Sequence, residues 1–96
     1  MSLAQSYSAK APIIIEYTLT LADTWYAINT AVRGVRRWVL KSRESTYNAF
    51  DYDYTATHTT YMTNGGIGIS RDNCDLPVVY ARSSTAGTIL ELEYWG

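Results

Sequence analysis

Apolar and polar side chains alternate along several short segments of the sequence, and this alternation limits the possible folds more than any other feature. Residues 88–95, TILELEYW, show it clearly. One side of this segment is apolar and the other is mixed, with Leu90, Leu92 and Tyr94 on the first side and Ile89, Glu91, Glu93 and Trp95 on the second. A period of two with one apolar side is typical of a half-buried β-strand. The chain is therefore expected to fold mainly as β-structure.

Segments rich in strand-forming residues recur along the chain and are separated by turn residues. Strands are expected at residues 13–22, 24–28, 35–43, 49–57, 59–63, 67–70, 78–83 and 88–95, with a loop at residues 44–48. Asn64, Gly65 and Gly66 form a strong turn signal. A short helical turn near residues 27–32 is a weaker alternative, since no segment keeps a helical apolar pattern over three turns. Seven to eight strands at a spacing of roughly 8–12 residues predict an all-β fold, an antiparallel β-sandwich with a jelly-roll-like topology.

The 96 residues are expected to form a single β-sandwich domain, with residues 1–11 as an extended arm or a cloning leader. Charged residues make up only 18% of the chain, which suggests that part of the surface faces protein rather than water. The net charge of -1 gives no reason to expect nucleic-acid binding. The apolar stretches are far shorter than the ~20 residues of a membrane-spanning helix, so no membrane partner is expected. Cys74 is the only cysteine, so no internal disulfide is expected.

Large aromatic side chains are more numerous than one face of a small sandwich can bury. There are nine Tyr and three Trp but one Phe, and Tyr and Trp suit half-wet positions and protein interfaces. The outward side of residues 88–95 carries Ile89 and Trp95, and Ile14 and Val39 point outward from their own strands in the same way. We therefore expect a homo-oligomer, with a trimer as one form. The expected contact residues are Trp95, Tyr94, Ile89, Trp25 and Tyr26. The alternative is a monomer whose own loops wrap these aromatic rings.

No motif suggests catalysis or metal binding. His58 is the only histidine, and it stands in TATHTTY without a nucleophile motif, so it is interpreted as a surface or edge histidine. Asp51 and Asp53 alternate with tyrosines and are expected on the solvent face of their strand. Residues 71–75, RDNCD, lack the spacing of a calcium loop. We expect no enzyme activity, no cofactor and no bound metal.

Basic residues gather in the third expected strand, where Arg37, Lys41 and Arg43 share one face. Such a group can follow a phosphate backbone. Cross-strand pairing with Asp51 and Asp53 of the following strand is the favoured interpretation, and no nucleic-acid partner is expected.

Exposed aromatic rings would support a different function, that of a carbohydrate- or receptor-binding module. Tyr52 and Tyr54 lie two residues apart and could contribute to such a surface, although their position beside Phe50 favours the core. A cupin-type enzyme with a jelly-roll fold would need several metal-binding histidines, and the chain has one.

Four stretches carry a resemblance to a known group of proteins: YTLTLADTWYAI, RRWVLKSR, YMTNGG and LPVVYARSSTAGTILELEYW. From about Ile15 to Trp95, their order and spacing resemble those of small β-sandwich structural and accessory proteins of tailed bacteriophage virions, including marine phage-derived environmental sequences. Pro77 departs from the pattern, in which a polar residue precedes the strand. The resemblance implies a non-enzymatic virion component of the decoration, head–tail or fibre-associated kind, made in the host cytoplasm. Such a component would contact copies of itself and other virion proteins. The resemblance also implies that Trp95 is structural, and it supplies no catalytic residue.

Overall fold

The computed structural model describes residues 12–43 and 48–96, and this part of the chain contains eight β-strands and no helix. The strands form two antiparallel sheets of four strands each, which confirms the predicted all-β sandwich. Within the described ranges there is accordingly no helix able to cross a membrane. The predicted arm or leader at residues 1–11 and most of the predicted loop at 44–48 lie outside the described residues.

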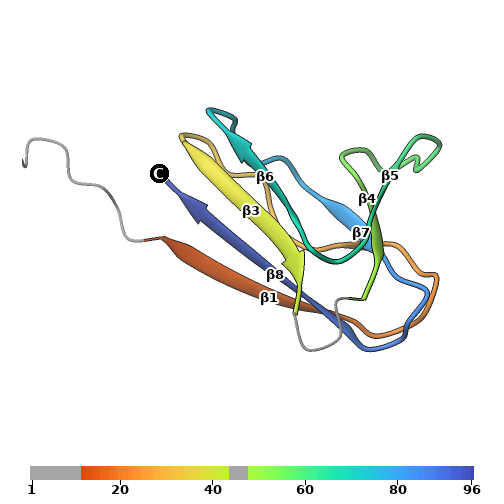
Figure 1. Cartoon of the computed structure of the whole chain (residues 1–96). Coiled ribbons are helices and arrows are strands. Elements are labelled where there is room, and N and C mark those ends of the chain that lie inside the picture. Colours follow the sequence, from red (N-terminus) through yellow and green to blue (C-terminus); the bar gives the residue numbers. More distant parts are fainter. Residues whose placement is uncertain (1–11, 44–47) are drawn as a thin grey trace, which may run out of the picture.

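Figure 1 shows the two sheets as separate layers. Sheet A contains, in spatial order, β1 (Ile13–Leu19), β8 (Thr88–Trp95), β3 (Arg37–Ser42) and β6 (Ile69–Asp72). Sheet B contains, in spatial order, β2 (Tyr26–Ala27), β7 (Tyr80–Arg82), β4 (Phe50–Asp53) and β5 (Met62–Asn64).

The order of the strands is that of a jelly roll. β1 pairs with β8, β2 with β7, β3 with β6 and β4 with β5, and every pair is antiparallel. The chain therefore behaves as one long hairpin that is wrapped into two layers. Every connection except β4–β5 crosses from one sheet to the other. The predicted jelly-roll-like topology is thus confirmed.

The core lies between the sheets and follows the predicted alternation. In β8, Leu90 and Leu92 are buried. Glu91, which lies between them, and Glu93, which follows Leu92, are only half-buried. Both sheets contribute large buried side chains, with Leu19, Trp38, Leu40, Leu90 and Leu92 from sheet A and Phe50 and Tyr52 from sheet B. Burial of each large apolar side chain stabilises the fold by about 1.5–3 kcal/mol, so these alternating positions hold the two layers together.

Several strands are shorter than the alternation predicts, because side chains or turns end them. β1 stops at Leu19, and Leu21 is exposed rather than inward as the pattern implied. β4 stops at Asp53, whose carboxylate accepts hydrogen bonds from the N–H groups of Tyr54 and Thr55 and turns the chain. The Tyr54 side chain is therefore 40% exposed, and its predicted place in the core is wrong.

The helical turn at residues 27–32, which the sequence offers only as a weaker alternative, does not form in the described chain. The N–H groups of Ile28 and Val32 donate instead to the carbonyls of Val79 and Leu76, at 2.9 Å in both cases. This segment is extended alongside the segment that leads into β7, so its hydrogen bonds are long-range rather than local.

Candidate functional site

The outer face of sheet B carries a group of ring and charged side chains, which we name the Trp25 cluster: Trp25, His58, Tyr61, Tyr80 and Arg82. The Trp25 and His58 rings stack with their centroids 4.2 Å apart and their planes 8° apart. The Arg82 guanidinium lies 4.8 Å from the ring centres of both Trp25 and Tyr61. Tyr80 meets the His58 ring edge to face at 5.2 Å. The cluster thus joins β7 to the segment before β2 and to the β4–β5 connection.

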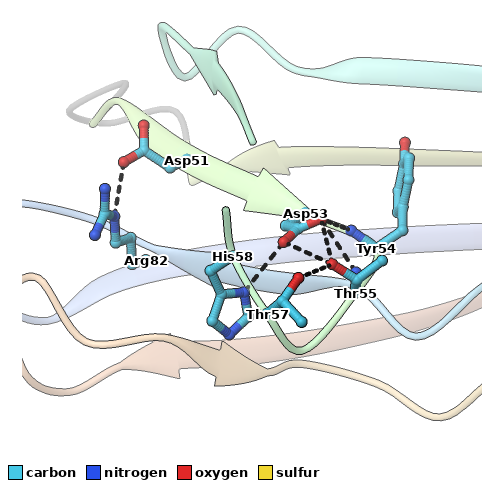
Figure 2. Close-up of polar contacts among 7 residues, drawn as sticks. All are labelled: Asp51, Asp53, Tyr54, Thr55, Thr57, His58 and Arg82. Atoms are coloured by element: carbon cyan, nitrogen blue, oxygen red, sulfur yellow. Dashed lines mark hydrogen bonds and ion pairs between the residues drawn. The ribbon is translucent and has the colours of Figure 1, made fainter. Parts of the chain in front are cut away.

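Arg82 is held in place by Asp51 on the neighbouring strand β4, as Figure 2 shows. The two residues are opposite each other in the β4–β7 register, and Arg82 Nε donates to Asp51 Oδ2 at 2.8 Å. The Thr63 hydroxyl donates to the other carboxylate oxygen at 2.7 Å. The hydrogen bond to Asp51 raises the pKa of Arg82, so the guanidinium stays charged beneath the aromatic rings.

Asp53 is buried, with 7% of its surface exposed, and the prediction that it faces solvent is wrong. Its carboxylate accepts hydrogen bonds from the N–H groups of Tyr54 and Thr55, from the Thr55 hydroxyl, and from His58 Nδ1 at 3.2 Å (Figure 2). Burial alone would raise the pKa of Asp53, but the hydrogen bonds from Thr55, His58 and Tyr54 outweigh it and lower that pKa. Asp53 therefore acts as the internal cap of the turn that follows β4.

His58 lies in that turn with a positive φ of 56°, and its side chain is only 19% exposed. His58 lies outside the strands, but its ring is largely covered by Trp25 and Asp53 and is not free at the surface, contrary to its interpretation as a surface or edge histidine.

The arrangement around His58 does not suit nucleophilic catalysis. A catalytic triad places histidine between a hydroxyl nucleophile and a carboxylate. Here the Thr55 hydroxyl bonds directly to Asp53 and to the Thr57 hydroxyl, so it bypasses His58 (Figure 2). Among residues 12–43 and 48–96 there is also no group of three or more His, Cys, Asp or Glu side chains that could hold a metal ion. Cys74 is an exposed free thiol.

A surface hollow of about 380 Å³ opens beside the Asp51–Arg82 pair. Its lining includes Asp23, Thr63 and Ser84 as well as this pair. The lining of the hollow is polar enough to hydrogen-bond a small hydroxylated ligand.

The outer face of sheet A is organised by an ion-pair network around Glu91. Lys41 Nζ lies 2.5 Å and Arg43 Nε 2.8 Å from the Glu91 carboxylate, and Arg43 also pairs with Glu16. Hydrogen bonds from Lys41 and Arg43 lower the pKa of Glu91, and those to Glu91 and Glu16 raise the pKa of Arg43.

The predicted pairing of the basic strand with Asp51 and Asp53 is wrong. β3 lies between β8 and β6 in sheet A, whereas β4 is in the other sheet. The remaining basic residue of that face, Arg37, accordingly pairs with Asp72 of β6 at 3.3 Å.

The five predicted contact residues are all half-buried within the chain, and they do not lie together on one surface. Tyr94 and Tyr26 pack against the core, while Ile89 and Trp95 lie on the outer face of β8. The Arg37 guanidinium lies 5.8 Å from the centre of the Trp95 ring. Trp25 is in the cluster described above. Their role in contacts between copies stays a prediction.

The most exposed large apolar side chains are different ones. About half or more of the surface of each of these residues is exposed: Ile13, Ile14, Leu21, Met62 and Ile67. Outward Ile14 follows from the alternation, but the exposure of Ile13 does not, because Ile13 shares a face with buried Leu19. It is exposed because it lies at the far end of an edge strand.

No family model matches the chain, and no curated protein or solved structure is significantly similar to it.

Proposed function

We propose that this chain is a non-enzymatic structural or accessory subunit of a phage-like particle, of the decoration, head–tail or fibre-associated kind. It acts through contacts with copies of itself and with other particle proteins, and its place of action is the virion. Jelly rolls are common in viral capsid proteins, although the fold alone does not decide function. The sequence resemblance described above points the same way.

The observation that carries the proposal is an exposed apolar strand at the side of sheet A. Ile13 and Ile14 are 49% and 66% exposed on β1, and Leu21 is exposed just beyond its end. Neighbouring exposed apolar side chains mark protein contact sites. In the polar clusters of the described chain, by contrast, the side chains bond to each other and do not position a reactive group. The Asp53 and Glu91 networks are examples.

A carbohydrate- or receptor-binding module is the second candidate, and the hollow beside Asp51 and Arg82 favours it. A stacking platform for sugar rings needs exposed, nearly coplanar aromatics. Trp25 and Tyr61 instead meet at 66°, and His58 and Arg82 already lie over the Trp25 ring. A glycan array tests this candidate, because specific binding that is lost in Asp51→Ala would favour it over the structural subunit.

The proposal is tested on particles purified by gradient centrifugation from cultures that carry the gene. Quantitative mass spectrometry is expected to find the chain at a fixed ratio to the major capsid protein, and the flanking genes are expected to encode capsid or portal proteins. A chain that stays in the soluble fraction while particles form without it would overturn the proposal.

A further inference from the structure

The open edge of sheet A differs from the other sheet edges in the described chain. β1 has seven residues, whereas the other edge strands β6, β5 and β2 have four, three and two. Natural proteins protect edges by keeping them short or by placing charges on them. β6 ends with Arg71 and Asp72, but β1 begins with three isoleucines. β1 is therefore the one edge in residues 12–43 and 48–96 that is both long and apolar.

The backbone of β1 has hydrogen-bonding groups that point away from the sheet. The carbonyl of Leu19 accepts the N–H of Gly87, so Leu19 and every second residue before it direct their backbone groups toward β8. The intervening residues Ile14, Glu16 and Thr18 then direct theirs to the open side. No other described segment pairs with that side of β1.

The single charge on β1 does not protect this edge. The Glu16 carboxylate is drawn across the outer face toward Arg43 of sheet A, with which it forms an ion pair. Ile14, the neighbour of Glu16 on that face, is left 66% exposed.

We infer that β1 joins two copies of this chain by antiparallel pairing of the two β1 strands about a two-fold axis at Ile15. The two copies of sheet A then form one continuous eight-stranded sheet. This inference rests on the proposed function, because it names the contact through which the copies associate.

A second copy fits this edge better than an arbitrary strand because β1 is complementary to itself in that register. Each Glu16 lies opposite Ile14 of the other copy, so no like charges meet and each Glu16 keeps its Arg43 partner. Ile13 lies opposite Tyr17 of the other copy, and the two Ile15 side chains face each other. The outward N–H groups of Ile14 and Glu16 meet carbonyls, and both exposed isoleucines become covered.

The first test measures molar mass by light scattering on the full chain at tens of micromolar. Ile14→Lys places a charge on the edge, and Thr18→Pro removes an N–H that has no partner in the described sheet. Both are expected to lower the mass of the assembly toward that of one chain, 10.8 kDa. The matched control is Ile67→Lys, since Ile67 is 80% exposed and lies off β1. Circular dichroism checks that each variant keeps its fold.

The second test reads the register by disulfide formation in a Cys74→Ser background. Across a two-fold at Ile15, the two copies of that residue form a non-hydrogen-bonded pair with Cα atoms about 4.5 Å apart, within reach of a disulfide. Ile15→Cys is therefore expected to give a covalent dimer under mild oxidation. In Thr18→Cys the two thiols would be about 20 Å apart along the strand, so this variant is expected to form no disulfide-linked dimer.

An oligomer that persists in both edge variants, or a Thr18→Cys dimer without an Ile15→Cys dimer, overturns the inference but leaves the proposed function standing. A trimer whose mass is unchanged by the β1 substitutions would likewise overturn the inference but leave the proposed function standing, because a two-fold contact alone cannot close a three-membered ring. A β1 dimer formed by a chain that is absent from particles overturns the proposed function alone. A full-length chain that is monomeric overturns the inference outright.

Discussion

Gly68, just before β6, provides the sharpest test of how the sheets are built. Its φ is +120°, and a Cβ atom there would lie 2.8 Å from Lys41 Cβ and 2.9 Å from the Leu40 carbonyl oxygen. Both contacts are shorter than side chains tolerate, and one is to backbone. Gly68→Ala therefore has to move β6 away from β3 or distort the turn that leads into it.

The expected cost follows from these two effects. A non-glycine residue in this region of φ costs about 1–3 kcal/mol, and overpacking against a fixed neighbour costs about 1–3 kcal/mol more. The sum, about 2–6 kcal/mol, is a large part of the roughly 5–14 kcal/mol that holds a domain of this size folded. At roughly 4–8 °C per kcal/mol, Tm is expected to fall by at least about 8 °C.

Urea unfolding followed by circular dichroism, at one fixed protein concentration, measures this difference. Two glycines serve as controls. A Cβ at Gly65 meets nothing within 4 Å and needs no positive φ, so Gly65→Ala is expected to be neutral or to stabilise slightly. Gly87 has open space but a φ of +81°, so Gly87→Ala is expected to cost about 1–2 kcal/mol. If the free energies of unfolding of Gly68→Ala and Gly65→Ala differ by less than about 0.5 kcal/mol, which is roughly the scatter of neutral substitutions, the close approach of β6 to β3 is refuted.

Three further predictions concern the polar networks. Glu91→Gln removes the shared partner of Lys41 and Arg43 and is expected to cost about 0.5–1 kcal/mol in urea unfolding, an effect that shrinks in high salt. Asp53→Asn is expected to lower Tm by roughly 4–8 °C at pH 7, because the turn after β4 loses its carboxylate acceptor. Since the pKa of Asp53 is lower in the folded state, its contribution is complete above about pH 5 and is lost as the pH falls below about 4 and through the lowered folded-state pKa, so the gap between wild type and Asp53→Asn closes in acid. Arg82→Lys keeps the charge but loses the planar contact with Trp25, which is expected to cost about 0.5–1 kcal/mol and to change the tryptophan fluorescence.

The outcomes that would contradict these three differ. A Glu91→Gln effect that is the same at low and high salt would mean that charge is not its source. A Tm gap for Asp53→Asn that stays constant down to pH 3 would contradict the lowered pKa. Unchanged stability and fluorescence in Arg82→Lys would show that the guanidinium is not held against the ring.

Much of the fold could be predicted because a strand's inward and outward sides are encoded locally. The final strand runs from Thr88 to Trp95 as the alternation requires, and Leu90 and Leu92 enter the core. The strand ends were harder to place. β4 stops at Asp53 because that side chain captures the next N–H groups, a local competition that the period-two pattern does not contain.

The candidate sites were less predictable, since both depend on partners that are distant in sequence. The sequence predicts that Lys41 and Arg43 pair with the aspartates of the next strand, but they pair with Glu91, about fifty positions away. The stacking of His58 on Trp25 had no sequence signal, because neither lies in a regular strand.

The sequence by itself determined that this chain is a β-protein and which side of most strands turns inward, since both follow from side-chain alternation within a few residues. Only the tertiary structure decided which strands are neighbours, and hence that Glu91 gathers the basic residues, that Asp53 is buried, and that β1 is left at the edge. The physical reason is that jelly-roll pairing joins segments far apart in the chain, so a strand's partners are set by how two whole layers pack and not by the residues beside it.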